Sequence, residues 1–154
     1  MTSLRRFAVL QLLLLWQGGF LFYTSVVVPL GTKLNGATGQ GALTARVTDW
    51  MNLFGVAALV LLALDTAFAS DPNRRRTACR WWAWFVAFVC QYLLFFVHVC
   101  LDHLMDDARR RVLVRDAFYP AHRVYLWVST VQWLAGLLLA WWSVRAWRAE
   151  DRAA

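Results

Sequence analysis

The chain has 154 residues, of which 60% are hydrophobic, and its formal net charge is +7. A soluble domain of this size has too little interior to hide so much apolar surface, whereas a lipid bilayer can cover the outward faces of helices. The arginines lie between apolar runs and not along one polar face. This distribution is typical of membrane topology signals and speaks against nucleic acid as a partner.

Four apolar stretches each approach or exceed the roughly 20 residues that are needed to cross a hydrocarbon core. They are Phe7–Leu30, Val47–Ala69, Trp81–Leu101 and Val124–Trp147. The sequence therefore predicts an all-α integral membrane protein, a four-helix up-down bundle that forms a single domain over residues 1–154. Polar connections are expected at Gly31–Arg46, Ser70–Arg80 and Asp102–Arg123, with the last helix restarting near His122 after Pro120.

The first apolar stretch follows Arg5 and Arg6, as in a signal peptide. Its apolar run continues to Pro29 without a convincing small-residue cleavage site, so we expect it to be the first crossing. Cleavage near Ala42 or Ala45 would instead leave three crossings.

Basic residues and tryptophans indicate the orientation of the bundle. With the N-terminus inside, nine basic residues lie on the inner side and seven on the outer side. Tryptophans open the third stretch and close the fourth, which would place them together in an aromatic belt at the inner boundary. Both termini are therefore expected on the cytoplasmic side.

Polar side chains within the apolar stretches fall on one face of each predicted helix. Such groups usually face the interior of a bundle, because lipid offers them no hydrogen-bond partner. At 100° per residue, the shared faces carry Gln17 and Thr24, then Asp49 and Asn52, then Gln91, His98 and Asp102, and finally His122, Tyr125, Ser129, Gln132 and Gly136. Gln91 and Gln132 lie at similar depths and are expected to hydrogen-bond to each other. In the inner half, Asp65 is almost the only polar residue.

An up-down bundle brings the polar ends of these faces to one membrane boundary. The expected ligand-binding cluster near the outer face consists of Tyr23, Asp49, Asn52, His98, Asp102, His122, Arg123 and Tyr125. Three interpretations stay open for it: a structural polar cap, a cleft for a small molecule or lipid headgroup, and a metal or haem site.

The metal interpretation depends on two histidines. His98 and Asp102 are four residues apart, so their imidazole and carboxylate share a helix face, and a carboxylate can orient a ligating histidine. His122 on the facing helix would supply a second nitrogen. Two imidazoles from adjacent helices suit haem b or a transition metal such as copper or zinc. Three histidines in the chain do not match a dense ligand motif such as HExxH.

Two short motifs carry a resemblance to a known group. Trp16-Gln17-Gly18-Gly19-Phe20 with Val27-Val28-Pro29, and His122-Arg123-Val124-Tyr125-Leu126 with Ser129, resemble the first and last helices of small bacterial four-span proteins of unassigned function, the transmembrane-protein-205-like group. The resemblance implies the four-span topology and directs attention to His122. It implies no settled reaction. The expected location of the chain is the inner (cytoplasmic) membrane of a bacterium.

The short connections and the absence of a catalytic motif favour a non-catalytic accessory or scaffold subunit, or a small-ligand-binding module. Expected partners are membrane lipids and either other membrane subunits or further copies of the chain. One alternative is a haem- or metal-binding redox protein that uses His98 and His122. A second alternative is a proton-coupled intramembrane enzyme or transporter component that uses Asp49, His98 and Asp102.

Overall fold

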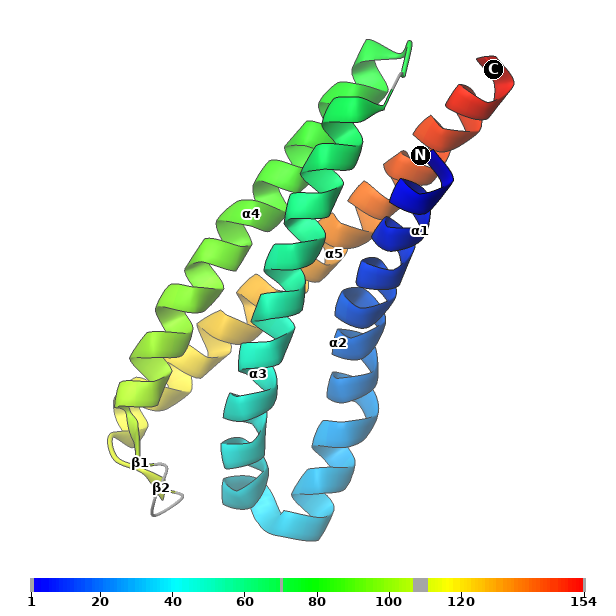
Figure 1. Ribbon diagram of the computed structural model, residues 1–154. Coiled ribbons are helices and arrows are strands. Elements are labelled where there is room, and N and C mark those ends of the chain that lie inside the picture. The colour runs from blue at the N-terminus through cyan, green and yellow to red at the C-terminus, as the bar shows by residue number, and fades with distance from the viewer. Residues whose placement is uncertain (1, 70, 107–110, 154) are drawn as a thin grey trace.

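Long apolar runs without helix-breaking residues favour helices, and the computed structural model is almost entirely helical (Figure 1). It describes residues 2–69, 71–106 and 111–153. Within these ranges three helices are long and apolar enough to cross a membrane: Ser3–Phe68, Arg74–His103 and Arg115–Ala153. The predicted all-α class is confirmed.

The first of these helices is a composite. It consists of α1 (Thr2–Leu13), the π-helical turn η1 (Leu14–Gly18), α2 (Gly19–Phe22), a second π-helical turn η2 (Tyr23–Val27) and α3 (Val28–Phe68). The backbone leaves the helical conformation at Gly36, with φ 71° and ψ 166°, a conformation that glycine adopts at little cost because it has no Cβ. The chain folds back there, so the two arms run side by side (Figure 1).

The expected connection Gly31–Arg46 between two separate helices is therefore wrong in detail. Its residues are helical on both sides of Gly36, and one positive φ is enough to reverse the chain. Side-chain contacts hold both ends of the fold-back: Tyr23 Oη donates to Thr44 Oγ1 at 2.9 Å, and Arg5 Nη1 donates to the carbonyl of Phe68 at 3.3 Å. In the described part of the chain there are accordingly three long helices, the first one sharply bent, in place of four.

Helix α4 (Arg74–His103) begins where Asn73 Oδ1 accepts the backbone N–H of Arg76 at 3.1 Å, which is a typical N-cap. It ends before two short antiparallel strands, β1 (Met105–Asp106) and β2 (Arg111–Val112). Helix α5 (Arg115–Ala153) follows and passes through Pro120. The predicted restart near His122 is wrong, because a proline this close to a helix start removes only one backbone hydrogen bond and the helix forms on both sides of it.

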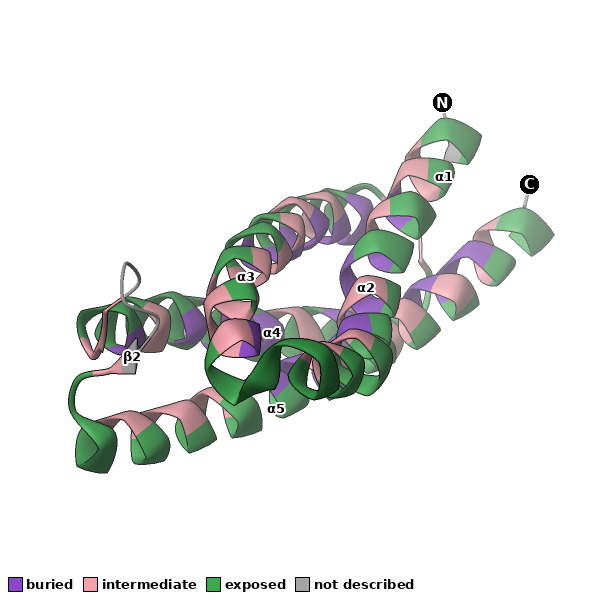
Figure 2. Ribbon diagram, turned by 90° about the horizontal axis from the view of Figure 1, so that it is seen from below, coloured by how far each residue is buried: buried purple, intermediate pink, exposed green. Residues whose placement is uncertain are grey.

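The helical segments pack antiparallel around a common core. Both termini lie at the end of the bundle that also carries the α3–α4 connection, and the Gly36 bend lies at the other end with β1 and β2 (Figure 1). Buried residues face inward and exposed residues face outward (Figure 2). The core includes Val9, Leu59, Leu62, Ala87 and Leu139, each at most 3% exposed.

The outward faces carry large apolar side chains. Trp82 is 68% exposed, Trp127 is 69% exposed and Phe96 is 63% exposed. These side chains lie on α4 and α5 within stretches apolar enough to cross a membrane. Apolar surface on this scale is unusual for a soluble monomer and is what lipid or neighbouring helices cover.

Candidate functional site

Helices α3, α4 and α5 bring together part of the predicted cluster, which we call the His98 cluster: Asp49, Asn52, His98, Asp102 and Tyr125. Nε2 of His98 lies 2.9 Å from Oδ1 of Asp49 and 3.7 Å from Oδ2 of Asp102. The ring of Tyr125 lies 6.3 Å from the imidazole, between ring centroids. The imidazole thus forms a hydrogen bond with the Asp49 carboxylate and has the Asp102 carboxylate and the Tyr125 ring beside it.

A chain of side-chain amides extends from the His98 cluster into the core. Nε2 of Gln91 donates to Oδ1 of Asn52 at 3.2 Å, and Nε2 of Gln132 donates to Oε1 of Gln91 at 3.0 Å. The predicted hydrogen bond between Gln91 and Gln132 is confirmed. All three amides are buried, and each hydrogen bond links two helices.

A small cavity of about 30 Å³ lies beside these amides. Its lining comes from the first arm and from α3, α4 and α5, and includes Trp16, Asn52, Tyr125, Ser129 and Gln132. A volume of roughly 30 Å³ is that of one water molecule in the liquid. The cavity has room for about one water molecule next to the side-chain amides.

Three residues of the predicted cluster lie elsewhere. Tyr23 is buried at the fold-back, where Gln40 Nε2 donates to its hydroxyl at 3.2 Å. The ring of His122 stacks on Phe118 of its own helix, 5.7 Å between centroids and 7° between planes. Arg123 is exposed.

The metal interpretation finds no support in this geometry. Across residues 2–69, 71–106 and 111–153, no group of three or more His, Cys, Asp or Glu side chains is arranged so that it could hold a metal ion. His98 and His122 face different neighbours, Asp49 in one case and Phe118 in the other. The pairing of the two imidazoles as ligands stays a prediction from the sequence.

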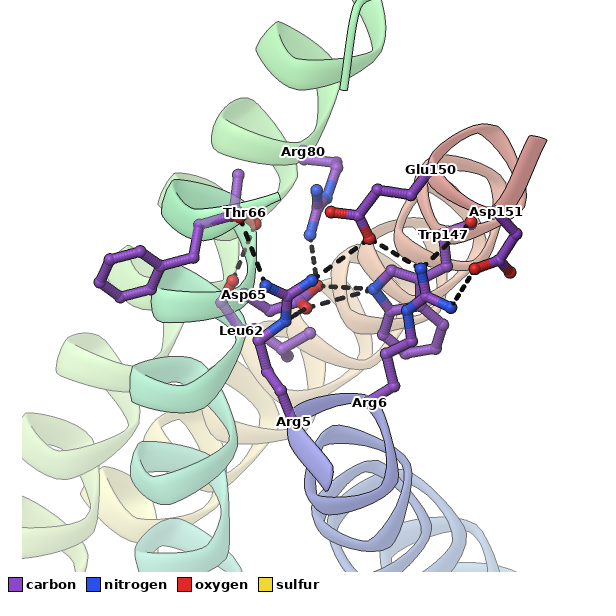
Figure 3. A network of polar contacts seen from close by, with 10 residues as sticks. Arg5, Arg6, Leu62, Asp65, Thr66, Arg80, Trp147, Glu150 and Asp151 are labelled. Carbon is purple, nitrogen blue, oxygen red and sulfur yellow. Dashed lines mark hydrogen bonds and ion pairs between the residues drawn. The ribbon is translucent and has the colours of Figure 1, made fainter. Parts of the chain in front are cut away.

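A second polar cluster, which sequence reasoning missed, lies at the end of the bundle that carries the termini (Figure 3). We call it the Asp65 cluster: Arg5, Arg6, Asp65, Arg80, Trp147, Glu150 and Asp151. Asp65 and Arg80 are both 0% exposed, and Oδ2 of Asp65 lies 2.6 Å from Nη2 of Arg80. Oδ1 of Asp65 lies 2.8 Å from Nε of Arg5, and the indole N–H of Trp147 donates to the same carboxylate at 3.0 Å. One carboxylate thus joins α1, α3, α4 and α5.

Further ion pairs extend the Asp65 cluster toward the surface. Oε2 of Glu150 lies 2.7 Å from Nη2 of Arg6 and 3.3 Å from Nη2 of Arg5. Oδ1 of Asp151 lies 2.7 Å from Nη1 of Arg6. The guanidinium of Arg6 also lies over the indole ring of Trp147, 5.8 Å from its centroid. These contacts fasten the first helix to the last one.

One sequence signal could have identified the Asp65 cluster. A lone carboxylate inside an apolar stretch needs a partner, because an unpaired charge in hydrocarbon is costly. In an up-down bundle, the basic residues at the same depth are Arg5 and Arg80. Counted only as topology signals at the membrane boundary, Arg5 and Arg80 do not reveal this pairing.

Three glycines make room for three buried glutamines. A Cβ added at Gly136 would lie 2.2 Å from Gln17 Nε2, one at Gly55 would lie 2.3 Å from Gln91 Oε1, and one at Gly31 would lie 1.8 Å from Gln40 Oε1. All three glutamines are buried. The small residues thus let polar side chains cross between segments at close approach, as in many helix interfaces in membranes.

An apolar layer separates the two polar clusters. Between Asn52 and Asp65 on α3, the inward residues are Gly55, Ala58, Leu59 and Leu62, and the last three are at most 3% exposed. Ala87 of α4 and Leu139 of α5, both 0% exposed, belong to the same hydrophobic core. The polar seam therefore does not continue from one end of the bundle to the other.

Comparison of the chain with models of known protein families, with curated proteins and with solved structures finds no match. The likeness of the first and last helices to the transmembrane-protein-205-like group therefore stays a prediction from two short motifs.

Proposed function

We propose that the chain crosses the membrane four times as a closed bundle and acts as a non-catalytic accessory or scaffold subunit. The observation that carries the proposal is the pairing of the interior polar groups with one another, through Asp65 at one end and through Asn52, Gln91 and Gln132 in the other half. Such contacts stabilise helix packing in lipid.

The fold-back at Gly36 supports four crossings. The arms before and after Gly36 are each longer than the roughly 20 helical residues that span a hydrocarbon core. Arg5 and Phe68 lie in contact at one end, and Tyr23 and Thr44 lie in contact toward the other. With α4 and α5, the two arms account for four antiparallel segments.

The position of the arginines supports the proposed orientation. Arg5 and Arg6 of α1, Arg80 of α4 and the arginines of the last turns of α5 lie at the end that carries both termini. Basic residues near span ends favour the cytoplasmic side. We therefore place both termini in the cytoplasm, with the inner membrane of a bacterium as the proposed location.

The outward aromatic faces support assembly with other membrane proteins. Trp82, Phe96 and Trp127 present rigid side chains of large area on α4 and α5. Lipid covers such groups equally well in the isolated chain, and neighbouring helices can replace that lipid by packing against them. Other membrane subunits or further copies of the chain are the proposed partners.

The test is the size of the particle that mild detergent releases from native membranes that contain the chain at its natural level. We expect a particle larger than the monomer, and mass analysis of its components distinguishes a second copy from a different subunit. If several mild detergents release only a free monomer, the proposed subunit role is wrong.

A proton-coupled role is the second candidate, and the contact between His98 and Asp49 favours it. The apolar layer at Leu59, Leu62 and Leu139 opposes it, because protons need a continuous chain of polar groups or water. Proton flux into vesicles that contain the purified chain tests this candidate. A flux that Asp49→Asn removes, with helix content unchanged, would replace the scaffold role with a proton-coupled one.

A further inference from the structure

A basic cleft lies outside both polar clusters, at the end of the bundle that carries the termini. It has a volume of about 290 Å³ and lies between the start of α4 and the last turns of α5. Four arginines line it, Arg76, Arg145, Arg148 and Arg152, together with the apolar side chains of Trp141 and Val144. Positive charge and an aromatic side chain thus meet in one concave surface.

The nearby carboxylates are paired with Arg76 or with arginines of α1, and not with the three arginines of α5. Asp71 binds Arg76 through two hydrogen bonds, Glu150 binds Arg5 and Arg6, and Asp151 binds Arg6. The charge of Arg76 is therefore offset. The excess positive charge of the cleft comes from the three arginines of α5.

Those three arginines share one face of α5, because they follow one another at intervals of three and four residues. Arg145, Arg148 and Arg152 are exposed, and in the described parts of the chain none of them forms an ion pair with a carboxylate. Like charges at this spacing repel one another. A bound anion would relieve that repulsion.

The chemistry of the cleft suits a phosphate at a membrane boundary. A guanidinium presents a planar fork that binds phosphate oxygens through two parallel hydrogen bonds. The guanidinium of Arg145 lies over the rings of Trp141 and Trp142, at 5.8 Å and 5.6 Å from their centroids. Trp141 is 59% exposed, and Leu138, three residues before it on α5, is 55% exposed. The apolar side of the cleft is therefore continuous with the outward apolar surface of α5.

We propose that this cleft binds the phosphate of an anionic phospholipid headgroup, with Arg145, Arg148 and Arg152 as the charged contacts and Trp141 beside the acyl chains. A lipid is favoured over a soluble phosphate because one wall of the cleft is the membrane-facing apolar surface itself. This inference rests on the proposal that the chain crosses a membrane. It does not depend on the proposed subunit role.

The experiment uses the purified full-length chain in a neutral detergent, titrated with phosphatidylglycerol or with phosphatidylcholine and followed by native mass spectrometry. We expect one phosphatidylglycerol molecule to bind in preference to phosphatidylcholine. Inorganic phosphate at millimolar concentration is expected neither to bind with comparable affinity nor to displace the lipid. Equal binding of the two lipids, or equally tight binding of inorganic phosphate, overturns the proposal.

Two variants with the same change of net charge test the location. Arg148→Gln with Arg152→Gln removes two charges from the cleft, and Arg74→Gln with Arg75→Gln removes two exposed charges at the same end of the bundle that do not line it. We expect the first pair to weaken phosphatidylglycerol binding on the order of 25-fold, from about 1 kcal/mol per arginine at a membrane surface. The second pair should weaken it less than about threefold. An equal loss in both pairs would mean diffuse attraction and no site.

The test is separate from that of the proposed function. A chain that binds phosphatidylglycerol selectively and is yet recovered from native membranes only as a monomer keeps the lipid site and loses the subunit role. Circular dichroism of each variant checks that the helix content is retained, and the lipid preference of the unaltered chain stands without any variant.

Discussion

Arg80 and Asp65 form an ion pair of 2.6 Å in which neither side chain is exposed. The two residues lie on α4 and α3, and the same carboxylate also receives Arg5 of α1 and Trp147 of α5. Charged residues inside a membrane usually pair in this way, because an unpaired charge in hydrocarbon has a high free-energy cost. It also fixes the register of the helices, because sliding any one of them by a turn would separate the charges.

We expect Asp65→Asn to lower the free energy of unfolding by about 3–5 kcal/mol, because it leaves the buried Arg80 without a compensating charge. Unfolding by denaturant in detergent micelles, followed by circular dichroism, measures the change. Asp151→Asn is the matched control. The Asp151 side chain is 62% exposed in its ion pair with Arg6, so its loss should cost about 0–1 kcal/mol. Equal effects of the two substitutions would contradict the assigned role of Asp65.

We expect Gly55→Ala to destabilise the bundle by about 1–2 kcal/mol, because the added Cβ would lie 2.3 Å from Oε1 of Gln91 and must displace that amide. The displacement breaks the hydrogen bonds of Gln91 with Asn52 and Gln132. Gly18→Ala is the control, since nothing lies within 4 Å of the added Cβ. That control should be neutral or slightly stabilising, because alanine favours helices more than glycine does. The same assay compares the free energies of unfolding of the two variants. An unchanged value for Gly55→Ala would contradict the prediction, because it would show that the core accommodates the added Cβ without loss of stability.

We expect Gln91→Leu and Gln132→Leu to be coupled in a double-mutant cycle, with an interaction of about 0.6–2 kcal/mol. The reason is the direct 3.0 Å hydrogen bond between the two amides. A cycle of Gln91→Leu with Gln40→Leu serves as the reference, because Gln40 binds Tyr23 and Thr44 at the fold-back and shares no partner with Gln91. That second cycle should be additive within about 0.5 kcal/mol. Additivity in both cycles would show that the hydrogen bond between Gln91 and Gln132 does not contribute to stability.

We expect the α3–α4 connection to weaken in acid. Hydrogen bonds from Arg76, together with one from the backbone of Asn73, hold the pKa of Asp71 below its ordinary value of 3.8. A carboxyl whose pKa is lower in the folded chain contributes stability above its unfolded pKa, and that stability is lost as the pH falls through the lowered folded pKa.

The measurement is the free energy of unfolding of the chain and of Asp71→Asn from pH 7 down to pH 2. The difference between them should be constant near neutral pH and should shrink only below about pH 4, in line with the lowered pKa of Asp71. A difference that persists unchanged at pH 2 would assign the effect to local shape and not to charge.

The sequence was sufficient to predict the helical class and the apolar surface. Hydropathy over a stretch such as Trp81–Leu101 depends only on composition and length, and α4 contains that stretch. Gln91 and Gln132 each lie on the polar face of their own helix and at similar depths, which was enough to predict their hydrogen bond because polar faces in an apolar bundle turn toward one another. The sequence also placed His98 and Asp49 in one cluster, and the structure shows their direct contact.

Only the tertiary structure decided which charges belong together. The sequence places Arg80 at a membrane boundary and leaves Asp65 alone in the inner half, whereas the packed helices bury both and join them to Arg5 and Trp147. The rotation of each helix about its axis sets these partners, and periodicity leaves that rotation open until the neighbouring helices are in place. The sequence likewise did not show that the ring of His122 stacks on Phe118, four residues before it on the same helix. Local pattern thus determined the helical class and the apolar outer surface, and side-chain packing between distant segments determined the polar clusters.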